Sequence, residues 1–149
     1  MILKRKNMKL IHEIFDEIAD TKSVKEKQQI LMDNERPQFK SVLKHMFDKD
    51  IKYKIKNIPK YKFCDDPDGL SNTQLEKQMF LVERLHDVEG NNLSEERATQ
   101  ILLNILEIIP EKEAKVLEKL ITKKLKVSGL TERLVRETFP SVLPEVAVS

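Results

Sequence analysis

Hydrophobic residues along most of the chain recur at the spacing of amphipathic helices. In residues 9–20, Ile11, Ile14 and Ile18 follow one another every three or four positions, which places one apolar stripe on a helix. Capping residues such as Ser23, or a proline in the first turn, mark the starts of further stretches of this kind. The pattern predicts helices over residues 9–20, 24–33, 37–47, 73–86, 95–109, 111–126 and 131–139.

Residues 51–63, IKYKIKNIPKYKF, have a different pattern, because apolar and lysine positions alternate from Ile51 to Lys56. Such alternation is typical of a strand or of an extended segment that lies over a core. Pro59 argues against a central strand, since proline cannot donate a hydrogen bond to a neighbouring strand. The sequence therefore predicts an all-α fold, a compact bundle of six to seven helices with one short extended basic segment.

Composition agrees with one compact helical domain. The chain has 149 residues, of which 40% are hydrophobic and 35% charged, and it has only three glycines. A single cysteine, Cys64, allows no intrachain disulfide and favours a reducing compartment. The basic N-terminus lacks the apolar core of a signal peptide, and no apolar run is long enough to cross a bilayer. We expect a monomeric cytoplasmic protein without membrane contact.

Charge is unevenly distributed, although the net charge is only +2. Residues 1–63 contain sixteen Lys and Arg against nine Asp and Glu, and residues 64–118 contain five against thirteen. Residues 119–149 again have a basic excess, six against three. Two basic ends that met in the fold would form one face suited to a polyanion, although many proteins segregate charge without such a partner.

Two groups of residues have types that can form metal or catalytic sites. The loop CDDPDG could place Asp66, Asp68 and Gly69 at positions 3, 5 and 6 of an EF-hand, but Cys64 and Leu75 would then occupy ligand positions. An acidic surface turn is the better interpretation.

The three histidines, His12, His45 and His86, fall one on each of three predicted helices with no paired spacing. They would have to converge in three dimensions to bind a metal, and surface or boundary positions are the better interpretation. No Gly-rich phosphate loop, Ser/His/Asp arrangement or CxxC motif is present in the sequence, so it predicts no catalysis and no cofactor.

The stretch KLITKKLKVSGLTERLVRETFP, residues 119–140, is more informative. On a helix over residues 111–126, Lys115, Lys119, Lys123 and Lys126 share one quarter of the circumference. Lys124 would fall among the apolar residues, so either the helix is already unwinding there or the side chain extends outward along the apolar surface.

After this helix the chain breaks at Ser128-Gly129 and restarts behind Thr131. Free backbone N–H groups at a helix start can bind a phosphate, and nearby lysines add long-range attraction to a phosphate backbone. The alternative is a solvated helix face followed by an ordinary capped turn.

Three segments resemble the short ATP-dependent DNA ligases of T-even-type bacteriophages. MKLIHEIFDEIADTKSVKEKQQIL, residues 8–31, is similar to the opening of those proteins, and DKDIKYKIKNIPK, residues 48–60, to their next run. VLEKLITKKLKVSGLTERLVRETFPSVLPE, residues 116–145, resembles the motif that closes their N-terminal domain. Val127 stands where that family has cysteine, and Ser128 is a one-residue insertion.

The resemblance implies the all-helical DNA-binding domain of such a ligase, which lies over the minor groove of nicked duplex DNA. It implies an extension at residues 1–7, the domain at 8–140 and a linker at 141–149 toward a nucleotidyltransferase domain. That domain would use ATP and Mg²⁺, and the chain lacks its Lys-x-Asp-Gly motif, since Asp66 precedes Asp68-Gly69 in place of lysine. We therefore expect DNA binding without adenylylation. The residues expected to contact phosphates are Lys123, Lys126, Ser128, Gly129 and Thr131, with Lys52, Lys54 and Lys56 as a second set.

Two other functions remain open at this level. The acidic middle of the chain and the apolar tail, with Val142, Leu143, Val146 and Val148, favour an interaction module that docks on a replication clamp or on a separate ligase catalytic subunit. The chain could also be a helical protein that shares ancestry with the ligases but has lost DNA binding.

Overall fold

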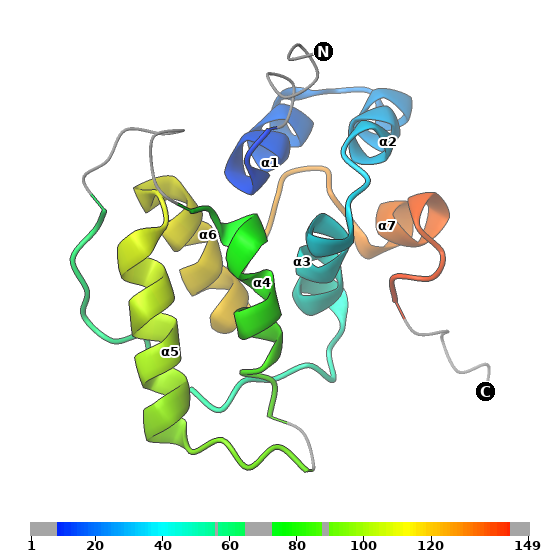
Figure 1. Ribbon diagram of the computed structural model, residues 1–149. Helices are drawn as coiled ribbons and strands as arrows, with labels where there is room; N and C mark the ends of the chain where they lie inside the picture. The colour runs from blue at the N-terminus through cyan, green and yellow to red at the C-terminus, as the bar shows by residue number, and fades with distance from the viewer. Residues whose placement is uncertain (1–8, 56, 65–72, 88–89, 144–149) are drawn as a thin grey trace, which may run out of the picture.

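The computed structural model describes residues 9–55, 57–64, 73–87 and 90–143, and within these ranges the protein is all-α, as predicted. Seven helices and no strands occur in these ranges (Figure 1). The helices are α1 (Ile11–Asp20), α2 (Val24–Asp33), α3 (Pro37–Phe47), α4 (Leu75–Glu83), α5 (Glu95–Ile108), α6 (Glu111–Ile121) and α7 (Glu132–Thr138).

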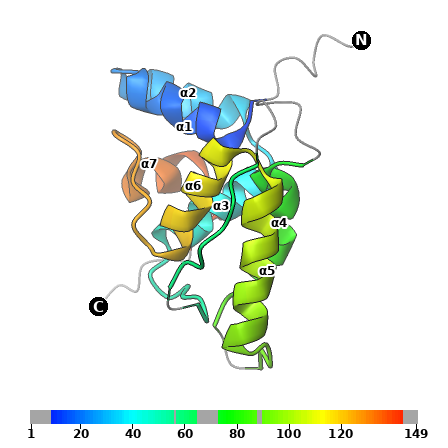
Figure 2. The same cartoon turned by 90° about the vertical axis from the view of Figure 1, so that its left-hand side faces the viewer.

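The helices form two neighbouring groups around α3. Helices α4, α5 and α6 pack on one another, and α2 packs against α1 and α7 (Figures 1 and 2). Helix α3 contacts α4 and α6, and α1 contacts α6, so that the groups share one core. Phe39, Leu102 and Leu117 are completely buried in it. Val142 and Leu143 belong to the same core, which extends the packed unit past residue 140.

The segment after α3 is extended, as the alternating pattern predicted. Ile51 and Ile55 are buried while Lys52 is exposed, which is the expected division between core and solvent. Tyr53 pairs with His86 in an isolated antiparallel bridge, and the N–H of Lys54 donates to the carbonyl of Leu85 at 3.3 Å. The extended segment is therefore held against the end of α4 without forming a sheet.

Helix α6 ends at Ile121, five residues before the predicted end at 126, so this boundary was wrong. Lys123 adopts a left-handed backbone, φ 59°, and its N–H donates to the carbonyl of Leu120 at 3.1 Å. The next N–H, of Lys124, donates to the carbonyl of Lys119 at 2.8 Å. This pair of bonds is a Schellman motif, which usually has glycine in the left-handed position. The usual glycine signal for the end of a helix is therefore missing, and the unwinding considered for Lys124 is confirmed.

The predicted restart behind Thr131 is present. Gly129 has φ 78°, the left-handed region in which glycine meets no steric cost, and the Leu130 N–H donates to the Val127 carbonyl at 3.0 Å. The Thr131 hydroxyl then accepts from the N–H of Leu134 at 3.1 Å and caps α7.

Helix α1 has a cap from a distant part of the chain. Glu113 of α6 is completely buried, and its carboxylate accepts hydrogen bonds from the backbone N–H groups of Ile11, at 3.3 Å, and His12, at 2.8 Å. The ring nitrogen Nδ1 of His12 lies 3.1 Å from the same carboxylate. A negative charge at a helix N-terminus is favourable, and this contact fixes α1 against α6.

Candidate nucleic-acid interface

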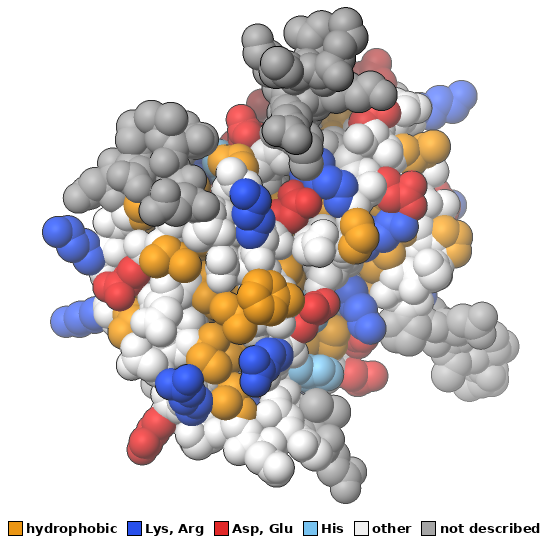
Figure 3. All heavy atoms as spheres, in the orientation of Figure 1, with side chains coloured by type: hydrophobic (Ala, Val, Ile, Leu, Met, Phe, Trp, Pro, Cys, Tyr) orange, Lys and Arg blue, Asp and Glu red, His pale blue; other side chains and the backbone are white. Residues whose placement is uncertain are grey.

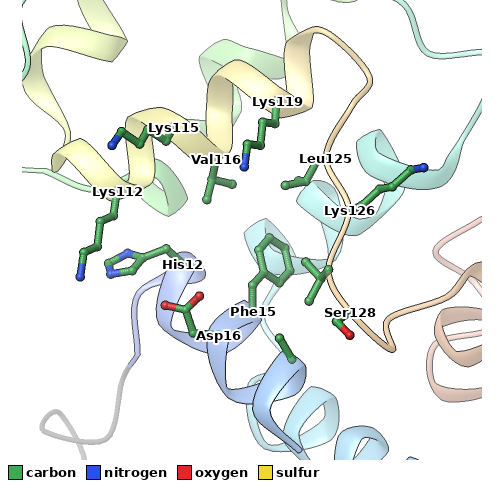
Figure 4. A pocket seen from close by; sticks show the side chains of 12 residues that line it. His12, Phe15, Asp16, Lys112, Lys115, Val116, Lys119, Leu125, Lys126 and Ser128 are labelled. Atoms are coloured by element: carbon green, nitrogen blue, oxygen red, sulfur yellow. The ribbon is translucent and has the colours of Figure 1, made fainter.

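A pocket of about 270 Å³ lies between α6, α1 and the segment that connects α6 to α7 (Figure 4). Its floor is apolar, with Phe15, Val116 and Leu125, and Lys119 points into it from α6 (Figure 4). The lining residues are His12, Phe15, Asp16, Ala19, Lys112, Lys115, Val116, Lys119, Leu125, Lys126, Val127 and Ser128. Two of the predicted contact residues, Lys126 and Ser128, thus share this pocket.

A second pocket, of about 440 Å³, lies between the extended segment and the end of α6. Lys52 lines it from one side, and Lys123 and Lys124 from the other. The two sets of predicted contact residues, which are about seventy positions apart in the sequence, therefore meet at one surface.

A third, shallow pocket joins the other two. It is lined by Ile58, Lys115, Glu118, Lys119 and Thr122, and it shares Lys115 and Lys119 with the first pocket and Thr122 with the second. The three pockets thus follow the outer side of α6 from one end to the other. We give the name lysine strip to six of the lysines that line these pockets, Lys52, Lys112, Lys115, Lys119, Lys124 and Lys126; Lys123 also lines the second pocket but has a different role, described below.

Most of the strip's ammonium groups are available to a ligand. Within the described ranges, those of Lys52, Lys119, Lys124 and Lys126 take part in no hydrogen bond or ion pair, and all four residues are exposed. Lys115 is the exception, because it pairs with Glu111 at 3.4 Å and lies 5.6 Å from the centre of the Phe63 ring.

Among the described residues, few acidic side chains lie along the strip. One of them, Glu118, accepts a hydrogen bond from the Tyr61 hydroxyl at 2.7 Å, and Asp16 lies at the edge of the first pocket (Figure 4). The strip is therefore an electropositive surface above an apolar floor.

Lys123 does not present its ammonium group to solvent in the same way. Its Nζ donates to the backbone carbonyls of His45, at 2.5 Å, and Asp48, at 3.1 Å, at the C-terminal end of α3. Desolvation lowers the pKa of Lys123, and the nearby Asp48 carboxylate opposes that shift. A cation at this end of a helix is favoured by the helix dipole. Lys123 thus fastens the end of α6 to the end of α3.

Lys54 has a similar role in the extended segment. Its ammonium donates to the carbonyls of Asn91, at 2.5 Å, and Leu93, at 2.6 Å, and so holds the loop that precedes α5. Lys56, the third lysine of that predicted set, lies outside the described residues.

The other predicted contacts lie around the break between α6 and α7. Ser128, Gly129 and Thr131 are exposed, but the Thr131 hydroxyl already caps α7. The side chain of Lys27, from α2, extends over Gly129, so close that a Cβ at this position would collide with its ammonium group. The chain thus brings a lysine from a distant helix to the break, and nothing in the sequence indicated it.

Two of the three histidines differ from the sequence-based expectation, and His86, which is half-buried, agrees with it. His12 and His45 are each only 5% exposed, so the surface or boundary assignment was wrong for both. His45 Nδ1 lies 2.6 Å from the Tyr53 hydroxyl, and the His45 and His86 rings are 6.5 Å apart. Burial, reinforced by His86 and Lys123, lowers the pKa of His45 to about 4. Burial also raises the pKa of Tyr53.

Sequence reasoning missed part of the strip. Lys112 and Lys124 were not among the expected contacts, and Lys115 and Lys119 were noted only as members of a helix face. Lys112 could have been found, since it precedes Lys115 by three positions and so lies on the same side of the helix. Lys124 could not, because its position depends on the left-handed turn at Lys123.

Several expectations fall outside the described residues. These are the acidic loop at 65–69, which was expected to be a surface turn and contains the Asp68-Gly69 pair, and the tail residues Val146 and Val148. Within the described ranges, no group of three or more His, Cys, Asp or Glu side chains could hold a metal ion. No helix in those ranges has both the length and the hydropathy to span a membrane.

The arrangement thus defines an all-α protein with a lysine-lined face. No protein-family model matches the chain, and a search of curated proteins finds no similar sequence. The similarity to phage DNA ligases therefore depends on the quoted segments alone.

Proposed function

We propose that this chain is a sequence-independent DNA-binding domain that grips the phosphate backbone of duplex DNA along the lysine strip. The observation that carries the proposal is that Lys52 and Lys124 line one pocket and Lys119 and Lys126 line a neighbouring one, with ammonium groups that take part in no hydrogen bond or ion pair among the described residues. Contacts of this kind fix the position of a protein on DNA and carry little information about base sequence.

The dimensions of α6 support a backbone ligand. From Lys112 to Ile121 the helix rises about 14 Å, which corresponds to about four base-pair steps along one strand of DNA. Along this helix Lys112, Lys115 and Lys119 follow one another at a rise of about 4.5 and 6 Å. A row of cations on this scale matches a repeating anion better than it matches one small phosphate compound.

The apolar floor of the first pocket supports the same ligand. Phe15, Val116 and Leu125 lie below the lysines and would pack against the sugars between adjacent phosphates. A site for inorganic phosphate would need polar donors in place of this floor. We propose that Lys123 and Lys54 position the strip from below, since their ammonium groups are bonded to backbone carbonyls.

The resemblance to phage ligases makes nicked duplex the proposed substrate, and the minor groove the proposed face of the DNA. In this proposal the chain positions a nick in DNA replication and repair for sealing by a catalytic domain that uses ATP and Mg²⁺. The chain itself has no catalytic role in it.

Fluorescence anisotropy tests the proposal. Nicked, intact and single-stranded DNA of about 20 nucleotides would be titrated with the protein at several salt concentrations. We expect affinity that falls steeply with salt, is indifferent to base sequence and is highest for the nicked duplex. Lys77→Glu, at an exposed lysine of α4 outside the strip, serves as the control for Lys119→Glu. Binding that is insensitive to salt, or equally weakened by both variants, would contradict the proposal.

The clamp-docking alternative loses part of its basis. Val142 and Leu143, which suggested an apolar docking tail, are buried in the core. No observation at these two residues favours a docking role over a packing role.

A further inference from the structure

A second surface, between α4 and α5, has a different chemistry. A groove of about 220 Å³ lies there, and it is lined by Gln78, Leu81, Arg84, Leu93, Arg97, Ile101, Asn104, Ile105 and Ile108. Ile108 is 46% exposed, and Phe80, one turn from Arg84 on the same helix, is 59% exposed. Figure 3 shows hydrophobic side chains gathered over α4 and α5, with blue basic side chains beside them.

The two helices give the groove a direction. Helices α4 and α5 run antiparallel and are joined at one end by residues 84–94 (Figure 1). Arg84 ends α4 and Arg97 lies in the first turn of α5, so both arginines are at the joined end, beside Leu93. Toward the other end the lining is mainly apolar, with Ile101, Ile105 and Ile108, and it also includes the amide side chains of Gln78 and Asn104.

Both arginines are unpaired within the described residues. Neither guanidinium takes part in an ion pair or a side-chain hydrogen bond there. Among the residues that the structure describes, the lining contains no acidic side chain, although residues 64–118 as a whole are strongly acidic. The groove is thus mainly apolar along its length and carries positive charge at one end.

From this arrangement we propose that the groove binds a short amphipathic helix of a partner protein, with acidic residues at the end that meets Arg84 and Arg97. Apolar side chains spaced i, i+3 or i+4 and i+7 would fill the groove between α4 and α5. Carboxylates at one end would accept paired hydrogen bonds from the arginines. The asymmetry of the groove fixes the direction of the bound helix.

Other ligand classes fit less well. The volume is below the range of about 300–1,000 Å³ that encloses a small molecule, but it accommodates a few apolar side chains. DNA would find no row of cations there, because the two arginines lie together at one end. The proposal is independent of the proposed DNA binding, since the lysine strip and this groove have no lining residue in common.

Two synthetic helical peptides of about 18 residues test the proposal. Both carry leucines at i, i+3, i+7 and i+10 and a lysine-free polar face, and one has its glutamates at the N-terminal end, the other at the C-terminal end. A third peptide has the same composition in scrambled order. Each would be titrated into ¹⁵N-labelled protein, and the shifts mapped onto the structure.

We expect one of the two ordered peptides to bind at least about tenfold more tightly than the scrambled one, with the largest shifts in α4 and α5. Arg97→Glu should lower the affinity for that peptide about tenfold. Arg133→Glu, at a side chain 88% exposed on α7, should leave the affinity unchanged. Ile108→Asp should also weaken it, with Val24→Asp, 64% exposed on α2, as its control.

Three results would overturn the proposal. They are equal binding of ordered and scrambled peptides, no binding of either ordered peptide at about 1 mM, and shifts centred on the lysine strip. The positions of the NMR shifts on the unaltered protein test the proposed binding site even if a variant unfolds. A competition with duplex DNA separates the two proposals, because DNA should not displace a peptide from this groove.

Discussion

The lysine strip and the α4–α5 groove are both positively charged, but the charge is arranged in opposite ways. On the strip, single ammonium groups are distributed along α6 and its neighbouring segments, above shallow pockets. In the groove, two guanidinium groups lie at one end of an apolar surface. Lysine acts as a hydrated point charge, whereas arginine recognises a carboxylate through a rigid planar fork.

In the two proposals, the position and type of the basic residues decide which ligand each surface binds, and net charge does not. The strip suits a long ligand with a repeating charge. The groove suits a folded ligand whose charge is confined to one end. A protein with both could hold DNA on one surface and a partner protein on the other, and each can be disrupted without touching the other.

Reversing charge on the strip should have the largest effect. For the double variant Lys119→Glu/Lys126→Glu we expect DNA affinity to fall about a hundredfold near physiological salt. Each substitution replaces an attraction to phosphate with a repulsion, and this change weakens binding by about 1–2 kcal/mol per substituted lysine. Peptide binding in the groove should be unchanged. Anisotropy with both ligands measures this, and parallel loss of both would show that the surfaces are not separate.

A second variant pair distinguishes a lysine that supports the strip from one that belongs to it. Lys123→Ala should lower the free energy of unfolding by about 2 kcal/mol, because two carbonyl groups at the end of α3 lose a charged donor. The neighbouring Lys124→Ala should change it by less than about 0.5 kcal/mol but should weaken DNA binding. Urea unfolding and anisotropy would be measured on both variants. A loss of stability in Lys124→Ala with a loss of DNA binding alone in Lys123→Ala would contradict these assignments.

The smallest effect concerns His45, below the end of the strip. Because the folded protein lowers the pKa of His45 from 6.5 to about 4, the unfolded chain binds a proton more readily, and acid favours unfolding. The stability is complete above pH 6.5 and is lost as pH falls toward 4. Between pH 7 and 5.5 the loss should be about 1 kcal/mol.

His45→Gln provides the control, since glutamine can keep a hydrogen bond to Tyr53 and cannot titrate. Urea unfolding at the two pH values should show a smaller pH effect in this variant than in the unaltered protein. An equal pH effect in both proteins would assign the acid sensitivity to other groups.

Much of the fold could be predicted because the core positions follow helical spacing. Ile11, Ile14 and Ile18 were expected on one stripe and are all completely buried. The alternation of Ile51, Lys52 and Ile55 likewise matches their burial and exposure. In these segments the local sequence pattern and the tertiary structure require the same side chains to be buried.

The candidate site was less predictable because its geometry depends on contacts between distant residues. Lys123 and Lys126 look alike in the sequence, yet only Lys123 forms a hydrogen bond to the end of α3. Its partner there, the carbonyl of His45, is seventy-eight positions away in the sequence. Lys27 reaches Gly129 from α2 in the same way. Periodicity can find a basic helix face, but it cannot tell which ammonium groups the fold itself uses.

The most direct test of DNA binding by the lysine strip is the salt dependence of binding to a nicked duplex. The logarithm of the association constant would be measured against the logarithm of salt concentration for the unaltered protein and for Lys119→Gln/Lys126→Gln. If both lysines contact phosphates, the variant's slope should be smaller by about 2, with the same change on any base sequence. An unchanged slope would contradict the assignment of the lysine strip as the DNA-binding surface.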